Sequence, residues 1–199
     1  MPPILNRLAL CLSLVLPLGC GVQSQPSGIA VVAPSAPQTT PTGIGSPRIE
    51  VAFSPDAGSE ALVVKVIASA SQSLRLAGYS FTSPVVVKAL MEAKRRGVDV
   101  RVLIDDRGNR SAASQSAQRL ITGAGIPLRV ISVYAIHHDK YIVVDGKTTE
   151  TGSFNYSQAA AKSNSENVLA IWNDRNVAAQ YLAHWDNRWA KGLDVEIAR

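Results

Sequence analysis

Between residues 48 and 191 the chain alternates short apolar segments, typical of β-strands, with longer segments that carry apolar residues at helical spacing. The pattern predicts strands at 48–53, 73–79, 98–104, 128–132, 140–144, 147–151 and 167–172. It predicts helices at 60–70, 84–96, 114–123 and 175–191, and a further helix that begins near Asn155. Strands separated by helices of about 10–15 residues are typical of parallel β-α-β units. We therefore expect an α/β fold in which a mostly parallel β-sheet is flanked by helices within a single domain.

Residues 1–20 are predicted to be a signal peptide for export. A single cation, Arg7, precedes an apolar run over residues 8–18, which is shorter than the ~20 apolar residues that span a bilayer. Gly19-Cys20 resembles a bacterial lipoprotein cleavage site, after which a lipidated Cys20 would tether the protein to a membrane. Cleavage after Ser24 by the ordinary signal peptidase is the alternative. Both alternatives predict a mature protein that is exported to the periplasm or cell envelope, or secreted.

Residues 21–47 are predicted to be a linker, because five prolines stand among Ser, Thr, Gln, Gly and Ala residues and this composition cannot bury a core. The folded domain is therefore expected at 48–199. The chain is 46% hydrophobic, which excludes an intrinsically disordered protein. Its two cysteines, Cys11 and Cys20, lie in the predicted leader, which excludes a disulfide-stapled domain and a zinc site built on thiolates. Without the leader the net charge falls from +5 to +4, since Arg7 is the one charged residue before Cys20, and this mild excess is compatible with an anionic partner.

The segment from 137 to 155 carries the residues best suited to chemistry on a phosphate. His138 and Lys140 are two apart on a predicted strand, so their side chains share one face. An ammonium can neutralise phosphate oxygens while the neighbouring imidazole attacks phosphorus or moves a proton. Asp145-Gly146 predicts a hairpin turn. The returning strand leads to Gly152-Ser153-Phe154-Asn155 at a predicted helix start, where N–H, hydroxyl and amide groups can bind an anion.

The spacing of these residues resembles a known motif. His138-x-Lys140, four residues, Asp145, six residues and Gly152-Ser153-x-Asn155 match the HKD motif of the phospholipase D superfamily at every defined position. Further segments are similar to the small bacterial endonucleases of that superfamily, and the resemblance covers residues 48–192. These segments are Gly78-Tyr79-Ser80-Phe81-Thr82, Arg95-Arg96-Gly97-Val98, Ile104-Asp105-Asp106-Arg107-Gly108-Asn109, Asn164-Ser165-Glu166-Asn167 and His184-Trp185-x-x-Arg188-Trp189.

The resemblance implies a role for each residue of the motif. His138 would be the nucleophile and would form a phosphohistidine, which water resolves in a second step. Lys140 and Asn155 would hold the phosphate oxygens, and Ser153 would support that pocket. Asp145 would be a positioning member of the catalytic set rather than an acid or base.

The resemblance also implies what surrounds the motif. Glu166 would hydrogen-bond the histidine ring and fix its tautomer. No metal ion or other cofactor is required, since the ammonium and amide groups neutralise the phosphate. From the residues alone, His137 and His184 are interpreted as structural. Tyr181, Trp185 and Trp189 follow one another at helical spacing and predict a stripe that faces the core.

The motif occurs once in this chain, whereas the implied chemistry uses two imidazoles, one on each side of the phosphorus. The resemblance therefore implies a homodimer with a shared active site. The expected substrate is nucleic acid, with a basic rim from Arg107, Arg110 and Arg119. The alternative is a phospholipase D-type enzyme that hydrolyses phospholipid headgroups.

Overall fold

The computed structural model describes residues 46–195, so the predicted leader, with Cys20 and Ser24, and most of the predicted linker lie outside the described residues. The strands are β1 (Arg48–Ser54), β2 (Ser73–Gly78), β3 (Asp99–Asp105), β4 (Leu128–Ile131), β5 (Lys140–Val144), β6 (Thr148–Gly152), β7 (Glu166–Trp172) and β8 (Leu193–Asp194). The helices are α1 (Ser59–Ala68), α2 (Pro84–Arg95), α3 (Ala112–Gly123), α4 (Gln158–Lys162) and α5 (Arg175–Trp189), with a 3₁₀ turn η1 (Arg107–Asn109). The strands form one sheet in the order β1-β7-β6-β5-β2-β3-β4-β8.

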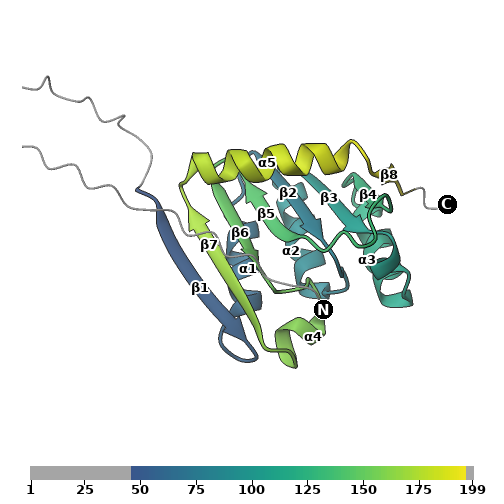
Figure 1. Ribbon diagram of the computed structural model, residues 1–199, viewed down its shortest axis with the longest axis horizontal. Helices are drawn as coiled ribbons and strands as arrows, with labels where there is room; N and C mark the ends of the chain where they lie inside the picture. The colour runs from purple at the N-terminus through teal and green to yellow at the C-terminus, as the bar shows by residue number, and fades with distance from the viewer. Residues whose placement is uncertain (1–45, 196–199) are drawn as a thin grey trace, which may run out of the picture. The chain divides into compact units, whose positions relative to one another are not determined.

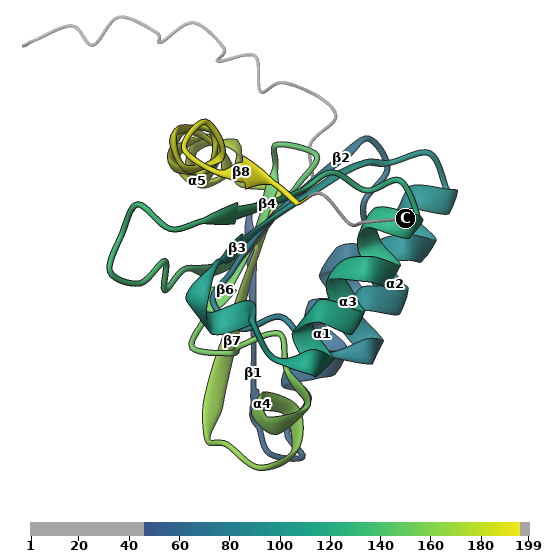
Figure 2. The ribbon, with the colours of Figure 1, turned by 90° about the vertical axis from the view of Figure 1, so that its right-hand side faces the viewer.

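Helices cover both faces of this sheet. The helices α1, α2 and α3 lie on one face, and the long helix α5 crosses the other (Figures 1 and 2). A large apolar core fills the space between the sheet and the first three helices. A smaller core lies beneath α5, where Trp185 is buried and donates its indole N–H to the Leu76 carbonyl at 3.1 Å. Within residues 46–195, no helix has the length and apolar content needed to cross a membrane.

The predicted α/β fold is confirmed, but the prediction of a mostly parallel sheet is wrong. Two strand pairs are parallel, β2 with β3 and β3 with β4, and helical crossovers through α2 and α3 join them. The other five pairs are antiparallel. The reason is that β5 enters from a loop without a helix and turns directly into β6 through a hairpin. A helix between two strands also does not make them neighbours, since β1 pairs with β7 and not with β2.

Two local predictions are confirmed and one is wrong. Asp145 and Gly146 adopt positive φ angles of 51° and 58° at the β5–β6 hairpin, a conformation that Gly and Asp tolerate. The Ser83 hydroxyl accepts the Val86 N–H at 3.2 Å and caps α2, with Pro84 in the first turn. The helix expected near Asn155 begins instead at Gln158, because Ser157 is its N-cap. Residues 152–155 therefore form a loop and not a helix N-terminus.

Candidate active site

The predicted catalytic residues meet at one end of the sheet. Gly78 at the end of β2 lies opposite Lys140 at the start of β5, and Tyr141 lies opposite Thr151 near the end of β6. Gly152 in turn lies opposite Val168 near the start of β7. The carboxyl ends of the parallel strands β2, β3 and β4 point to this same end, which is where ligands bind in many α/β sheets.

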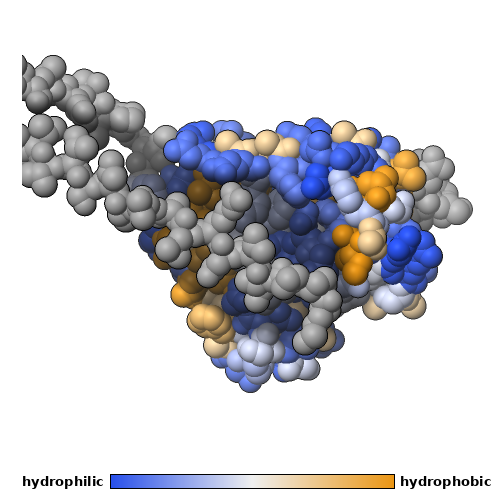
Figure 3. Space-filling view, in the orientation of Figure 1, coloured by the Kyte–Doolittle hydropathy of each residue, from blue (hydrophilic) through white to orange (hydrophobic). Residues whose placement is uncertain are grey.

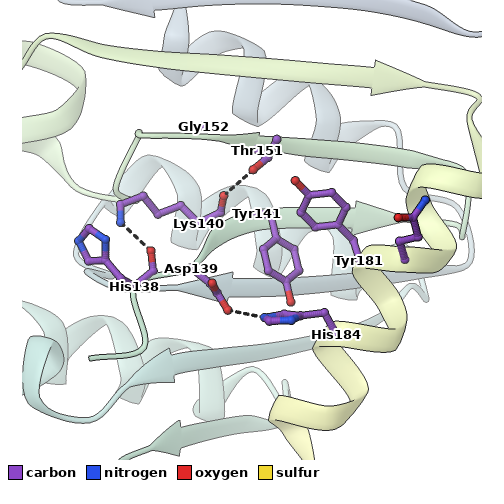
Figure 4. A pocket seen from close by; sticks show the side chains of 9 residues that line it. His138, Asp139, Lys140, Tyr141, Thr151, Gly152, Tyr181 and His184 are labelled. Atoms are coloured by element: carbon purple, nitrogen blue, oxygen red, sulfur yellow. Dashed lines mark hydrogen bonds and ion pairs between the residues drawn. The ribbon is translucent and has the colours of Figure 1, made fainter. Parts of the chain in front are cut away.

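A cavity of about 440 Å³ opens here between the strand ends and α5 (Figure 4). His138 and Lys140 lie at one side of it, and the other side is formed by α5. Its lining consists of His138, Asp139, Lys140, Tyr141, Thr151, Gly152, Gln180, Tyr181 and His184.

His138 and Lys140 share one aromatic neighbour, Tyr79. The His138 ring packs against Tyr79 with 4.7 Å between ring centroids, and Lys140 Nζ lies 5.3 Å from the centroid of the same ring. Lys140 Nζ also donates to the His138 carbonyl at 3.0 Å, while the His138 side chain is exposed. Lys140 is only 7% exposed, and this burial lowers the pKa of Lys140, against the opposing charges of Glu166 and Asp139. A poorly solvated ammonium beside an exposed imidazole is an environment that an anionic phosphate would stabilise.

The loop from Gly152 to Asn155 lies beside Glu166. The Ser153 hydroxyl donates to Glu166 Oε2 at 2.6 Å, and Asn164 Nδ2 donates to Glu166 Oε1 at 2.9 Å. Asn155 Oδ1 is buried and has no hydrogen-bond partner among the described residues. The expected hydrogen bond between Glu166 and the His138 ring is not found in the part of the chain that the structure describes. The Ser153 hydroxyl and the Asn164 amide occupy the carboxylate instead.

Asp145 lies away from this site. It follows β5 at the end opposite to His138, and five strand residues at about 3.4 Å each put it roughly 17 Å from Lys140 along the strand. Its carboxylate accepts the backbone N–H groups of Ser71, Gln72 and Ser73 at 2.8–3.3 Å, and the Ser71 hydroxyl at 2.7 Å. Partial burial raises the pKa of Asp145, but these hydrogen bonds outweigh it and the pKa is lowered. Its grouping with the catalytic residues is therefore corrected: Asp145 joins the β5–β6 turn to the start of β2.

Sequence reasoning missed the residues that hold the catalytic strand in place. Asp105, buried at the end of β3, accepts the His137 N–H at 2.8 Å and the Gly108 N–H at 2.6 Å. Asn109 donates from Nδ2 to the carbonyls of Tyr79 at 2.6 Å and Asp105 at 2.7 Å. These bonds fix the peptide before His138 and the backbone of its aromatic neighbour. The available signal was a pair of short polar residues directly after a buried strand.

His184 is part of the cavity wall and not only a structural residue of α5. Its Nε2 lies 2.9 Å from Asp139 Oδ2, and His137 Nδ1 lies 3.4 Å from the same oxygen. His137 is buried, and burial lowers its pKa despite the opposing charge of Asp139. Among residues 46–195, no three His, Cys, Asp or Glu side chains are grouped so that they could hold a metal ion.

The chain matches known proteins over most of this domain. Residues 63–189 match the family described as "Cardiolipin synthase, PLD-like domain". The chain is 37% identical over 145 residues to a protein named "Phospholipase D" from Rickettsia felis, covering 72% of this chain and 70% of that protein. It is 33% identical over 134 residues to "Mitochondrial cardiolipin hydrolase" from Xenopus laevis, covering 67% of this chain and 62% of that protein.

A solved structure supports the same assignment. The crystal structure of Nuc, a phospholipase D family member from Salmonella typhimurium, matches with a TM-score of 0.75 and 47% identity. The match covers 76% of this chain and 100% of that chain. The HKD residues around the cavity, the family match and this likeness agree, and the chain therefore belongs to the phospholipase D superfamily of phosphodiesterase hydrolases.

Proposed function

We propose that the protein is a metal-independent nuclease that hydrolyses the phosphodiester backbone of nucleic acid through a phosphohistidine. The observation that carries this proposal is the exposed imidazole of His138 beside the buried ammonium of Lys140, at the mouth of an open cavity. Lys140, with Asn155 next to it in the Gly152–Asn155 loop, would bind the non-bridging oxygens. Ser153 would hold Glu166 and the loop in place through its hydrogen bond.

The proposed reaction has two displacements. A ring nitrogen of His138 attacks phosphorus, the bond to the leaving oxygen breaks, and a second imidazole donates a proton to that oxygen. Water then attacks the phosphohistidine, loses its proton to the second imidazole, and releases His138 and a phosphomonoester. Throughout, the charge that builds on the phosphate oxygens is stabilised by Lys140.

The second imidazole is proposed to be His138 of a second copy in a homodimer with a shared active site. The part of the sheet face that α5 leaves uncovered offers a surface for such a partner. On β1, the residues Ala52 and Ser54 are buried toward α1, so Ile49, Val51 and Phe53 point to the face that carries α5. These three side chains are 67%, 59% and 54% exposed, and apolar residues gather along this edge in Figure 3.

The test offers purified protein plasmid DNA, RNA and labelled phospholipid in parallel, with EDTA present. We expect cleavage of nucleic acid in EDTA and its loss in His138→Ala, with Lys140→Ala nearly as damaging. Loss of activity in EDTA that a divalent ion restores would contradict the metal-free reaction. Release of the headgroup from phospholipid, without cleavage of nucleic acid, would favour the phospholipase alternative.

Export is also proposed, with removal of residues up to Cys20 or up to Ser24. Mass spectrometry of the mature N-terminus distinguishes a lipidated Cys20 from an unmodified start at Gln25. Recovery of protein that begins at Met1 from the cytoplasm would contradict both.

A further inference from the structure

The connection between β4 and β5 projects from the sheet on the side of α5 and leads directly into His138 (Figure 2). Three cations from two other elements fix this loop. Arg107 Nη1 donates to the Ala135 carbonyl at 3.3 Å. Around Tyr134, the Arg188 guanidinium carbon lies 4.9 Å from the ring centroid and Lys191 Nζ donates to the hydroxyl at 2.8 Å.

These three cations differ from most of the surface cations nearby. Among the residues described, no carboxylate oxygen lies within 4.0 Å of Arg107, Arg188 or Lys191. By contrast, Arg110 is bonded to Asp106 and Arg129 to Asp194. Positive charge that no carboxylate neutralises therefore concentrates around Tyr134.

This placement changes the basic rim that the sequence predicted. Arg107 lies against the loop as expected, but Arg110 is neutralised by Asp106. Arg119 lies on α3, on the opposite face of the sheet from α5 (Figure 2). Arg188 and Lys191 come from the C-terminal end of α5 and the residues after it, about 50 residues from the motif in sequence, and only the tertiary structure brings them to the loop.

We propose that Arg107, Arg188 and Lys191, here called the cationic track, bind backbone phosphates of a nucleic-acid strand next to the bond that is cut. This inference rests on the proposed nuclease function and names the surface through which that function selects a polymer. Cations whose positions are already fixed by Tyr134 and Ala135 lose little conformational freedom when phosphates bind. Each phosphate contact releases counterions, so the track contributes most at low salt.

Two apolar side chains of the same loop, Val133 and Ile136, are 61% and 55% exposed. In the proposed complex they lie within reach of sugars and bases beside the track. An anionic bilayer is a weaker fit, because binding in a membrane interface uses a broad apolar face and this loop exposes only these two large apolar side chains among the residues described. Bilayer binding is an outcome of the test below.

The experiment compares two double variants that each remove two positive charges. The track variant is Arg188→Gln with Lys191→Gln. The matched control is Arg95→Gln with Arg110→Gln, whose exposed guanidinium groups are paired with Glu92 and Asp106. Each protein is given a single-stranded oligonucleotide of about 30 nucleotides and, separately, bis(4-nitrophenyl) phosphate, which is too small to reach the track from the cavity.

We expect the track variant to lose about tenfold or more in kcat/KM on the oligonucleotide at 50 mM salt, with a salt dependence shallower by about one unit of slope per lost contact. Its hydrolysis of bis(4-nitrophenyl) phosphate should stay within about threefold of wild type, which shows that the site is folded. The control should resemble wild type on both substrates. Equal losses in the two double variants, or an unchanged oligonucleotide rate in the track variant, would overturn the proposal.

Two further outcomes separate this proposal from its alternatives. Vesicles of phosphatidylglycerol are offered to the same proteins. If the track variant loses vesicle binding while it still cuts the oligonucleotide at the wild-type rate, the surface binds lipid and the proposal is wrong. If wild type hydrolyses bis(4-nitrophenyl) phosphate but not the oligonucleotide, the nuclease function itself fails, and the track proposal fails with it.

Discussion

At the scale of single residues, Glu150 is the clearest case of a group whose environment sets its charge. It lies on β6 between Ile142 and Ala170, is 1% exposed, and its Oε2 accepts the Tyr156 hydroxyl at 2.9 Å. Burial raises the pKa of Glu150 to about 8, against the opposing hydrogen bond from Tyr156. Glu150 and Tyr156 flank the Gly152–Asn155 loop, so their hydrogen bond joins its two ends.

The raised pKa predicts how stability depends on pH. The folded protein holds the Glu150 proton more tightly than the unfolded chain, so this contribution is fully present below about pH 4 and is lost as pH rises toward 8. Glu150→Gln keeps an acceptor for Tyr156 and cannot ionise. We expect its melting temperature to equal that of wild type near pH 5 and to exceed it increasingly up to pH 8, by at most about 1.4 kcal/mol of stability per pH unit.

Thr149→Val is the matched control for Glu150→Gln, since Thr149 is buried on the opposite face of the same strand and its hydroxyl has no partner among the described residues. Its effect on the melting temperature should be the same at every pH. A difference between Glu150→Gln and wild type that does not change from pH 5 to pH 8 would show that Glu150 does not titrate in this range.

At the scale of elements, the β5–β6 hairpin is held to the start of β2 by Asp145. The lowered pKa of Asp145 means that this contribution is present above its unfolded pKa of about 3.9 and is lost as pH falls through the folded value. At neutral pH, Asp145→Asn should cost about 1–3 kcal/mol of unfolding free energy, because acceptor oxygens for several N–H groups are weakened or lost. It should leave kcat/KM on bis(4-nitrophenyl) phosphate within about threefold, because the site lies at the other end of the strand.

Urea unfolding and steady-state kinetics on the same samples check this prediction. Asp56→Asn is the control, since Asp56 is exposed and has a similar positive φ of 59°. A loss of kcat of a hundredfold or more in Asp145→Asn, without loss of stability, would return Asp145 to the catalytic set.

At the scale of the whole molecule, one His138 per chain predicts that two chains complete one site. Mixed dimers of wild-type and His138→Ala subunits test this arrangement. Two independent sites would leave the mixed dimer roughly half active, because non-interacting sites add. One composite site would leave it almost inactive, so addition of the variant should inhibit wild type as subunits exchange. Half activity in purified mixed dimers, or full activity in a protein that light scattering shows to be monomeric, would contradict the shared site.

What the sequence determined by itself was local. Alternation and helical spacing predicted the type of each main element, Asp145-Gly146 predicted the hairpin turn, and Ser83-Pro84 predicted the start of α2. The spacing of His138 and Lys140 also predicted neighbouring side chains on a strand. These features depend on residues a few positions apart, where backbone geometry leaves few alternatives.

Only the tertiary structure decided which strands are neighbours and which polar groups meet. Periodicity tells which face of a strand is buried but not which strand lies beside it, so β5 could be paired antiparallel with β2 without any local signal. The partners of Glu166, the distance of Asp145 from the cavity, and the contacts of Asp105 and Lys191 with the β4–β5 loop all join segments far apart in the chain. Such contacts form because buried donors and acceptors must be satisfied by whatever the packed strands bring near.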